Sequence, residues 1–293
     1  MLIYIFFGFL GGLHRALWGG YKDSPYEPYK ISKSLRSVII GTSWGIILFI
    51  IFPFIGIQSE TIAPAYIFLM TIALDTITTE FYKLFIRTEP QGKYAIPSMF
   101  HAWSRQISNF QRILICMSLT LFLGGLFYIL TQINTYLIPI PKITVGSLTG
   151  IYGGIIIAFL EVIETVLFQS AIRGGTLGLV GGILEATGGM WKDAPFEGLE
   201  PLKFFRSPLV GLFWGTILSF NQPNLAVLFL SILGADRMTI ELYKTFVIRK
   251  KIGKFKADKP TFPEWVTKRN IFVLPYVVTW AIFLIYLFLP YHQ

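Results

Sequence analysis

The stretch GFLGGLHRALWGGYKDSPYEPYKISKSLRSVIIGTSWGIILF, residues 8–49, returns as GLVGGILEATGGMWKDAPFEGLEPLKFFRSPLVGLFWGTILS, residues 178–219. At a constant offset of 170 and without a gap, 17 of the 42 aligned positions are identical. Random matching would give roughly three identities, at about 7% per position for ordinary residue usage. The sequence therefore predicts a tandem duplication, which has to be recognised before a fold is assigned.

A second block repeats at an offset of 161, and one deletion of nine residues between the blocks reconciles the two offsets. The identities in this block are Asp75, Thr78, Glu80, Tyr82, Lys83, Phe85, Gly92 and Lys93, which recur as Asp236, Thr239, Glu241, Tyr243, Lys244, Phe246, Gly253 and Lys254. Polar residues that are kept in both copies are the first candidates for function.

Composition indicates a polytopic membrane protein. Of the 293 residues, 54% are hydrophobic and only 14% are charged, with a mean hydropathy of +0.61. Soluble chains carry about 25% charged residues, so a soluble fold would lack the polar surface to coat itself. We predict an all-α membrane bundle with a first repeat at 1–135, a linker membrane helix at 136–170 and a second repeat at 171–293.

Apolar runs mark the candidate membrane helices. A helix needs about 20 residues to cross the hydrocarbon core, and the glycine-rich run 174–190 falls short of that length. The run 208–220 is also short. The full set is 2–18, 37–57, 61–84, 112–132, 144–170, 174–190, 208–220, 224–247 and 270–290.

The connecting loops constrain the topology. Lys and Arg concentrate in loops 19–36, 85–112, 191–207 and 248–269, and such loops stay on the cytoplasmic side. If all four are cytoplasmic, the halves share one orientation, and one of the three runs between the second and third loops does not cross. We expect 174–190, and by symmetry 2–18, to be re-entrant. Full crossings by every run and inverted repeats remain the alternative, so about seven to nine segments are predicted.

The first repeated signature is Gly-Gly-x10-Lys-Asp-x-Pro-x-Glu. It places a lysine and two acids at the membrane surface in each half, namely Lys22, Asp23 and Glu27, and Lys192, Asp193 and Glu197. One interpretation is a loop clip, in which the acids pair with Lys33 or Arg36, and with Lys203 or Arg206 in the second half. The other is a gate for a substrate or ion, or a site for a lipid headgroup.

The second signature, Asp-x2-Thr-x-Glu-x-Tyr-Lys-x-Phe, carries acids into the membrane. Asp75 and Asp236 precede their helix ends by roughly nine residues, which is on the order of 13 Å of depth. Glu80 and Lys83 are three residues apart and can pair near the interface. A carboxylate at depth is a functional-site hypothesis by default. The alternative is a buried interhelical ion pair, for example with Arg237.

Two further features add charges within apolar runs. Arg15 and Glu185 occupy equivalent positions with opposite charge, and we predict that they lie close together across a pseudo-two-fold axis. Glu161 and Glu164 share one helical face with Thr165. They are a candidate cation or proton site, or else they pair near the interface with Arg173.

Several chemistries have no support in the sequence. The single cysteine and the three scattered histidines give no zinc or haem spacing, and phosphate-binding and nucleotide-binding glycine motifs are absent. We therefore predict no metal and no cofactor. The basic residues form no stripe for a nucleic acid, but a basic surface would attract anionic lipids.

The sequence favours a transporter or carrier with an ion- or proton-linked polar site at the interface of the two repeats. The ion or substrate candidates are Glu161, Glu164, Asp75, Asp236, Arg15 and Glu185. Two alternatives stay open. The chain is a membrane enzyme acting on a phosphate-bearing lipid, or it is a structural subunit of a larger membrane complex. A homo-oligomer or hetero-oligomer is compatible with each of these functions.

Overall fold

The computed structural model describes residues 1–88, 92, 94–102, 105–133, 151–221, 224–248, 256 and 259–289, and only the backbone at 102, 106 and 151–168. The described chain is almost entirely helical, which confirms the all-α class. The helices are α1 (Leu2–Asp23), α2 (Ile31–Phe54), α3 (Pro64–Phe81), α4 (Asn109–Ile133), α5 (Ile151–Glu197), α6 (Pro201–Leu218), α7 (Leu225–Leu242), α8 (Glu264–Lys268) and α9 (Val273–Phe288).

Short elements complete the described chain. Tyr82–Ile86 and Tyr243–Val247 form π-helical turns directly after α3 and α7, and Ser59–Thr61 and Arg269–Phe272 are 3-10 turns. The two-residue strands β1 (His101–Ala102) and β2 (Arg105–Gln106) pair antiparallel.

Helices α3 and α7 form the centre of the bundle. Both are apolar around most of their circumference, and most of their residues are buried. They cross closely at Gly234, where an added Cβ would overlap the backbone carbonyl of Leu69. A helix that is apolar all round is suited to a position enclosed by other helices. The pair therefore forms a core around which the remaining helices are arranged.

Glycines join the neighbouring helices into two antiparallel hairpins. In the α1–α2 hairpin, a Cβ on Gly8 would lie 2.7 Å from the carbonyl oxygen of Gly41. In the α5–α6 hairpin, a Cβ on Gly178 would overlap the carbonyl oxygen of Gly211. Small residues allow the backbones of membrane helices to approach closely.

Four helical stretches in the described part of the chain are long and apolar enough to cross a membrane. They are Leu2–Asp23, Ile31–Phe54, Asn109–Ile133 and Glu264–Phe288. Helix α4 exposes apolar side chains along most of its length and buries only Arg112, Leu130 and Thr131. Such a surface is compatible with contact to lipid, and these helices support an integral membrane protein.

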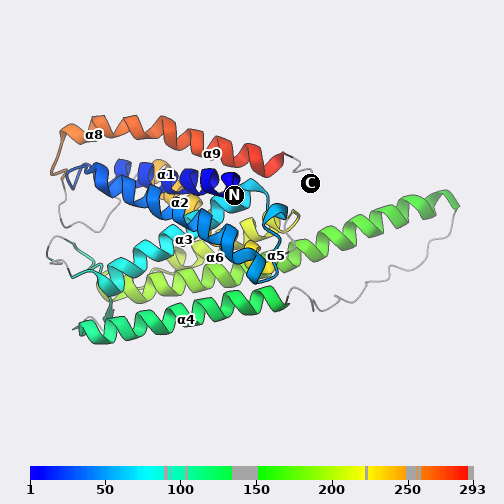
Figure 1. Cartoon of the computed structure of the whole chain (residues 1–293), viewed down its shortest axis with the longest axis horizontal. Helices are drawn as coiled ribbons and strands as arrows, with labels where there is room; N and C mark the ends of the chain where they lie inside the picture. Colours follow the sequence, from blue (N-terminus) through cyan, green and yellow to red (C-terminus); the bar gives the residue numbers. More distant parts are fainter. Residues whose placement is uncertain are drawn as a thin grey trace.

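The runs 144–170 and 174–190 do not form separate helices. From Ile151 to Glu197 they are one helix of 47 residues, about 70 Å long at 1.5 Å per residue, whose N-terminal part extends away from the bundle (Figure 1). The prediction of a separate re-entrant helix at 174–190 is wrong, and the expected boundary at 170/171 falls inside α5. A glycine costs a helix only about 1 kcal/mol, and Gly174 and Gly175 lie against α6.

Helix α1 also differs from the prediction. The run 2–18 was expected to be short and re-entrant, but α1 continues to Asp23 and has 22 residues, enough to span a bilayer. The polar residues of its last turn extend the helix without adding to the apolar run, which is why the run alone underestimates its length.

The basic connections lie at one end of the molecule. In Figure 1 the turns between α1 and α2 and between α3 and α4, together with α8, gather at the left. Helix α7 ends there too, because Thr245 in the turn after it contacts Trp18 near the end of α1. Helices α1, α3 and α7 therefore point toward the same end, which we call the basic end.

Candidate functional site

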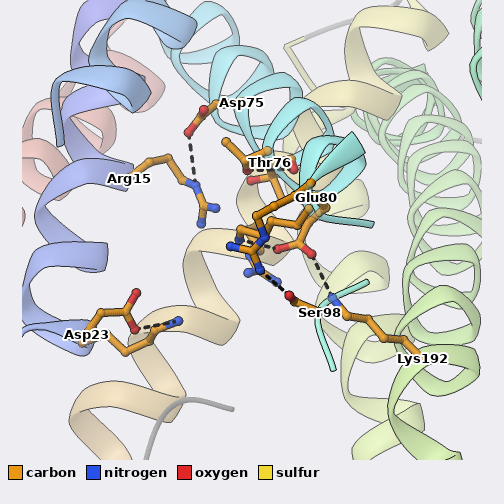
Figure 2. A network of polar contacts seen from close by, with 12 residues as sticks. Arg15, Asp23, Asp75, Thr76, Glu80, Ser98 and Lys192 are labelled. Atoms are coloured by element: carbon orange, nitrogen blue, oxygen red, sulfur yellow. Dashed lines mark hydrogen bonds and ion pairs between the residues drawn. The ribbon is translucent and has the colours of Figure 1, made fainter. Parts of the chain in front are cut away.

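Near the basic end, buried and half-buried charges from α1, α3, α5 and α7 come together (Figure 2). We call this group of charged residues the central ion-pair network. It consists of Arg15, Asp75, Glu80, Lys83, Lys192, Arg237 and Glu241. Most lie near the C-terminal ends of their helices, where the apolar runs give way to polar sequence.

Glu241 is a buried carboxylate whose ion-pair partners lie on two helices, α1 and α7. Its side chain is 2% exposed. It accepts hydrogen bonds from Arg15 on α1 and from Arg237 Nε, one turn earlier on α7, at 2.6 Å. A buried carboxylate is stable only when it is paired in this way. Glu241 therefore couples α7 to a helix from the other half of the chain.

Glu80 occupies the equivalent place at the end of α3. Its carboxylate lies 3.0 Å from Lys83 Nζ and 3.0 Å from Lys192 Nζ on α5, so the predicted Glu80–Lys83 pair is confirmed. Each glutamate thus pairs with a cation from its own segment and with a cation from the first helix of the other half. Arg237 lies within electrostatic range of both carboxylates. One cationic partner of each glutamate therefore comes from the other half of the chain: Arg15 for Glu241 and Lys192 for Glu80.

Asp75 lies deeper along α3 and is fully buried. Arg15 Nε is 3.5 Å from Asp75 Oδ2, but neither carboxylate oxygen has a hydrogen-bond partner (Figure 2). Arg15 therefore bridges Asp75 of its own half and Glu241 of the other half.

Asp236, the equivalent of Asp75, is 1% exposed, and neither of its carboxylate oxygens has a hydrogen-bond partner that meets normal geometry. The charged group that acts on it most strongly is Glu185. Arg15 forms its ion pairs with Asp75 and Glu241, and no ion pair between Arg15 and Glu185 is present among the described residues, so their predicted proximity stays a prediction. Arg15 therefore lies beside Asp75, and Glu185 lies within electrostatic range of Asp236.

Trp18 connects the network to the turn after α7. Its indole N–H donates to Thr245 Oγ1 at 2.9 Å, and Lys22 Nζ lies 4.4 Å from the ring centre in a cation–π contact. The sequence comparison missed Trp18 because Gly188 occupies the equivalent position. The signal that could have found it is an amphipathic indole one turn before the lysine of the repeated signature.

His14 fastens α9 to α1. Its Nδ1 is 2.8 Å from Thr279 Oγ1, and its ring stacks on Tyr276 with centres 4.6 Å apart. The imidazole is fully buried next to Arg15. The last helix of the second half is therefore held against the first helix of the first half.

The acids of the first signature form clips in the connecting loops. Glu27 accepts from Lys33, and Glu197 accepts from Lys203, six residues later in each case. Asp193 lies 4.0 Å from Lys203, and Lys22 lies 3.4 Å from Asp23. The ion pairs expected for the loop-clip interpretation are confirmed. A gate or headgroup role for these residues stays a prediction.

The two repeated tryptophans make equivalent hydrogen bonds. Trp44 Nε1 donates to Thr78 Oγ1 at 2.9 Å, and Trp214 Nε1 donates to Thr239 Oγ1 at 2.7 Å. Offsets of 170 for the donor and 161 for the acceptor relate the two bonds. These contacts join α2 to α3 and α6 to α7.

Arg112 was not singled out by the sequence. It is fully buried at the start of α4 and donates to the carbonyl oxygens of Leu84 at 3.0 Å and Arg87 at 2.6 Å. The carbonyls belong to the π-helical turn after α3 and the residue that follows it. The arginine therefore anchors α4 to the end of α3, and its role depends on local backbone geometry that the repeat does not reveal.

Three further predicted residues remain, namely Glu161, Glu164 and Lys244. Glu161 and Glu164 belong to α5, but their side chains are outside the described residues. Lys244 is half-buried in the turn after α7, and it has no ion pair or hydrogen bond with any described residue. Burial, with repulsion from Arg206 and Arg237, lowers its pKa from 10.5 to about 7.

A hollow of about 460 Å³ lies between the end of α5 and the start of α6. It is lined by Thr187, Met190, Trp191, Ala194, Pro195 and Phe204, none of which is a predicted site residue. Comparisons of the chain with protein-family models, curated proteins and solved structures find no match.

Proposed function

We propose that this chain is a multi-pass membrane carrier made of two tandem homologous units, 1–135 and 171–293, with its transport path between them. The observation that supports this proposal is that each half supplies a cation to a glutamate of the other half. Lys192 reaches Glu80 of the first unit, and Arg15 reaches Glu241 of the second. Such pairs close one end of the interface between the units, and separating the units there would break them.

Matched contacts support the two units. The tryptophan–threonine bonds, the glutamate–lysine clips, the glycine contacts of the hairpins and the π-helical turns each occur twice, at positions that the two sequence offsets relate. Carriers with internal repeats place their binding site between the repeats, near the middle of the bilayer. Asp75 and Asp236 are buried in α3 and α7, the central pair of helices.

In this proposal the central ion-pair network is a gate at the basic end, and the buried aspartates lie behind it. Opening replaces the exchanged ion pairs with water. Water compensates charged groups well, because it removes the desolvation penalty of buried pairs. The gate can therefore alternate between closed and hydrated states that differ little in free energy. The positive-inside rule assigns the basic end to the cytoplasm.

Accessibility of a buried residue behind the gate tests the carrier. Ser231 on α7 is fully buried and lies five residues before Asp236. In a Cys116→Ser background, we expect Ser231→Cys to react slowly with a membrane-impermeant maleimide. Adding Glu241→Gln weakens the gate and should raise the reaction rate several-fold. Glu264→Cys, on exposed α8, should react equally fast in both backgrounds.

The result that contradicts the carrier is an unreactive Ser231→Cys in both backgrounds while Glu264→Cys is labelled. The interior would then be solid at all times. That outcome favours the structural subunit of a larger complex.

Two observations favour the structural subunit as the second candidate. Helix α4 leaves its apolar surface uncovered, and the apolar N-terminal part of α5 extends beyond the bundle (Figure 1). Neither observation explains why buried carboxylates are kept in both halves, so we place the carrier first.

A further inference from the structure

The two buried aspartates differ in the residue that faces them. In the first unit, Asp75 has the guanidinium of Arg15 at 3.5 Å. In the second unit, the position equivalent to Arg15 holds Glu185, and the charge is reversed. A cation that is built into one unit is therefore missing from the same place in the other. An anion as buried as Asp236 requires some compensation for its lost hydration.

The register of α5 against α7 brings Glu185 to Asp236. A Cβ on Gly181 would lie 3.3 Å from the ring of Phe229 and 3.5 Å from Leu233 on α7. Helices α5 and α7 run in the same direction. One turn beyond this contact, Glu185 lies four residues after Gly181 on α5, and Asp236 lies three residues after Leu233 on α7. The strong electrostatic contact between the two carboxyls agrees with this register.

The other groups around Asp236 leave the aspartate unpaired. Ser207 and Arg206 approach it from α6, and Arg237 is its neighbour on α7. Arg237 Nε is engaged by Glu241 at 2.6 Å, and the Nε of Arg206 has no hydrogen-bond partner. Both carboxylate oxygens of Asp236 also lack a partner. The arginines balance part of the charge at a distance but donate no hydrogen bond to the aspartate.

We propose that Asp236 and Glu185 form a proton-binding site that shares one proton between the two carboxyl groups. The proton comes from water. It binds one carboxylate oxygen, and the resulting O–H donates to the other carboxylate, so the pair carries a single negative charge. Two carboxylates in contact at low dielectric do not both ionise. The proton takes the place that the Arg15 guanidinium holds in the first unit.

A proton fits this site better than a divalent metal ion. Calcium requires six to eight oxygen ligands, whereas the carboxyl pair and Ser207 supply far fewer. The site would give the carrier a proton coupling that acts in one unit only, and in that sense the inference rests on the proposed function. Proton binding itself is measurable without transport.

Infrared difference spectroscopy of the purified full-length protein, titrated with acid and base, tests the site. The wild type should show the carbonyl band of a protonated carboxyl group that persists at about pH 7, where ordinary carboxyls with pKa values of about 4 are ionised. Asp236→Asn should lose this band at that pH, and Glu185→Gln should lower the pH at which the band disappears. Glu264→Gln, at an exposed acid outside the site, should retain it.

A charge replacement sharpens the test. Glu185→Arg introduces the cation that the first unit has, so the band should weaken or disappear at about pH 7. Thermal unfolding checks that each variant is folded, and the two amide variants decide the result if Glu185→Arg does not fold. A band that persists at about pH 7 in both amide variants overturns the proton site.

The two proposals fail separately. Loss of the band in Asp236→Asn together with an unreactive Ser231→Cys would keep the proton site and remove the carrier. A reactive Ser231→Cys with an unchanged band would keep the carrier and remove this site.

Discussion

At the scale of single residues, equivalent positions of the two halves do not have equivalent surroundings. Lys83 pairs with Glu80 at 3.0 Å, whereas its counterpart Lys244 makes no ion pair with a described residue. The difference arises because Glu241, which stands where Glu80 does, is already engaged by Arg15 and Arg237. The repeat identifies which residues matter but not which partner each one takes.

This difference predicts opposite effects of one substitution on stability. Lys83→Met removes a partner of a half-buried carboxylate and should lower the free energy of unfolding by about 1 kcal/mol. Lys244→Met removes a half-buried cation that is surrounded by other cations, so it should leave stability unchanged or raise it. Thermal unfolding of the two variants in detergent measures both effects. Equal destabilisation by the two substitutions would contradict the unequal pairing.

The same lysine predicts a pH dependence. With a pKa lowered to about 7 in the folded state against 10.5 when exposed, Lys244 binds fewer protons when folded than when unfolded between these values. Stability contributed by this group therefore rises as the pH rises from about 7 toward 10.5. The unfolding temperature of the wild type should increase over this range relative to that of Lys244→Met. A constant difference between the two curves would show that Lys244 titrates normally.

At the scale of helices, sequence patterns located most elements but not their limits. The apolar runs found α3, α4, α7 and α9 to within about five residues, but they missed the first six residues of α2 and the first seven of α6. They failed at α5, where Gly174 and Gly175 suggested a break that the glycine contact with α6 makes unnecessary. They also shortened α1, because polar residues near a helix end belong to the helix without being apolar. Helix ends depend on capping and contacts that hydropathy does not record.

Glycine contacts between helices give a prediction with a matched control. A Cβ on Gly41 would lie 2.6 Å from the carbonyl oxygen of Gly8, while Gly124 on α4 has nothing within 4 Å. Gly41→Ala should therefore force α1 and α2 apart and cost about 1–3 kcal/mol, and Gly124→Ala should cost nothing. Unfolding by heat or denaturant compares the two. A harmless Gly41→Ala would mean that the hairpin is loosely packed.

At the scale of the whole molecule, the sequence predicted the basic end but not how the halves engage. The charge bias placed four loops together, and in Figure 1 the connections that can be followed do lie together. The exchanged ion pairs and the contact of α9 with α1 could not be predicted, because they depend on how two units pack, and a repeat describes each unit separately. For the same reason, the ion pairs of Arg15 with Asp75 and Glu241 could not be predicted from its alignment with Glu185.

The arrangement of the two halves predicts the outcome of a labelling experiment. If the halves have the same orientation, exposed positions in the first, third and fourth basic loops lie on one side of the membrane. In a Cys116→Ser background, cysteines that replace Lys30, Glu200 and Glu264 should be labelled by an impermeant maleimide from one side only. A cysteine that replaces Glu60, in the turn between α2 and α3, should be labelled from the opposite side.

Inverted repeats give a different pattern, because Lys30 and Glu200 belong to equivalent loops of the two halves and would then be labelled from opposite sides. Permeabilised vesicles, in which all four cysteines should react, exclude a position that is simply buried. The experiment separates the two topologies that charge bias leaves open. It depends only on which way α1 and the C-terminal part of α5 cross the bilayer, so it holds whether the molecule is a carrier or a structural subunit.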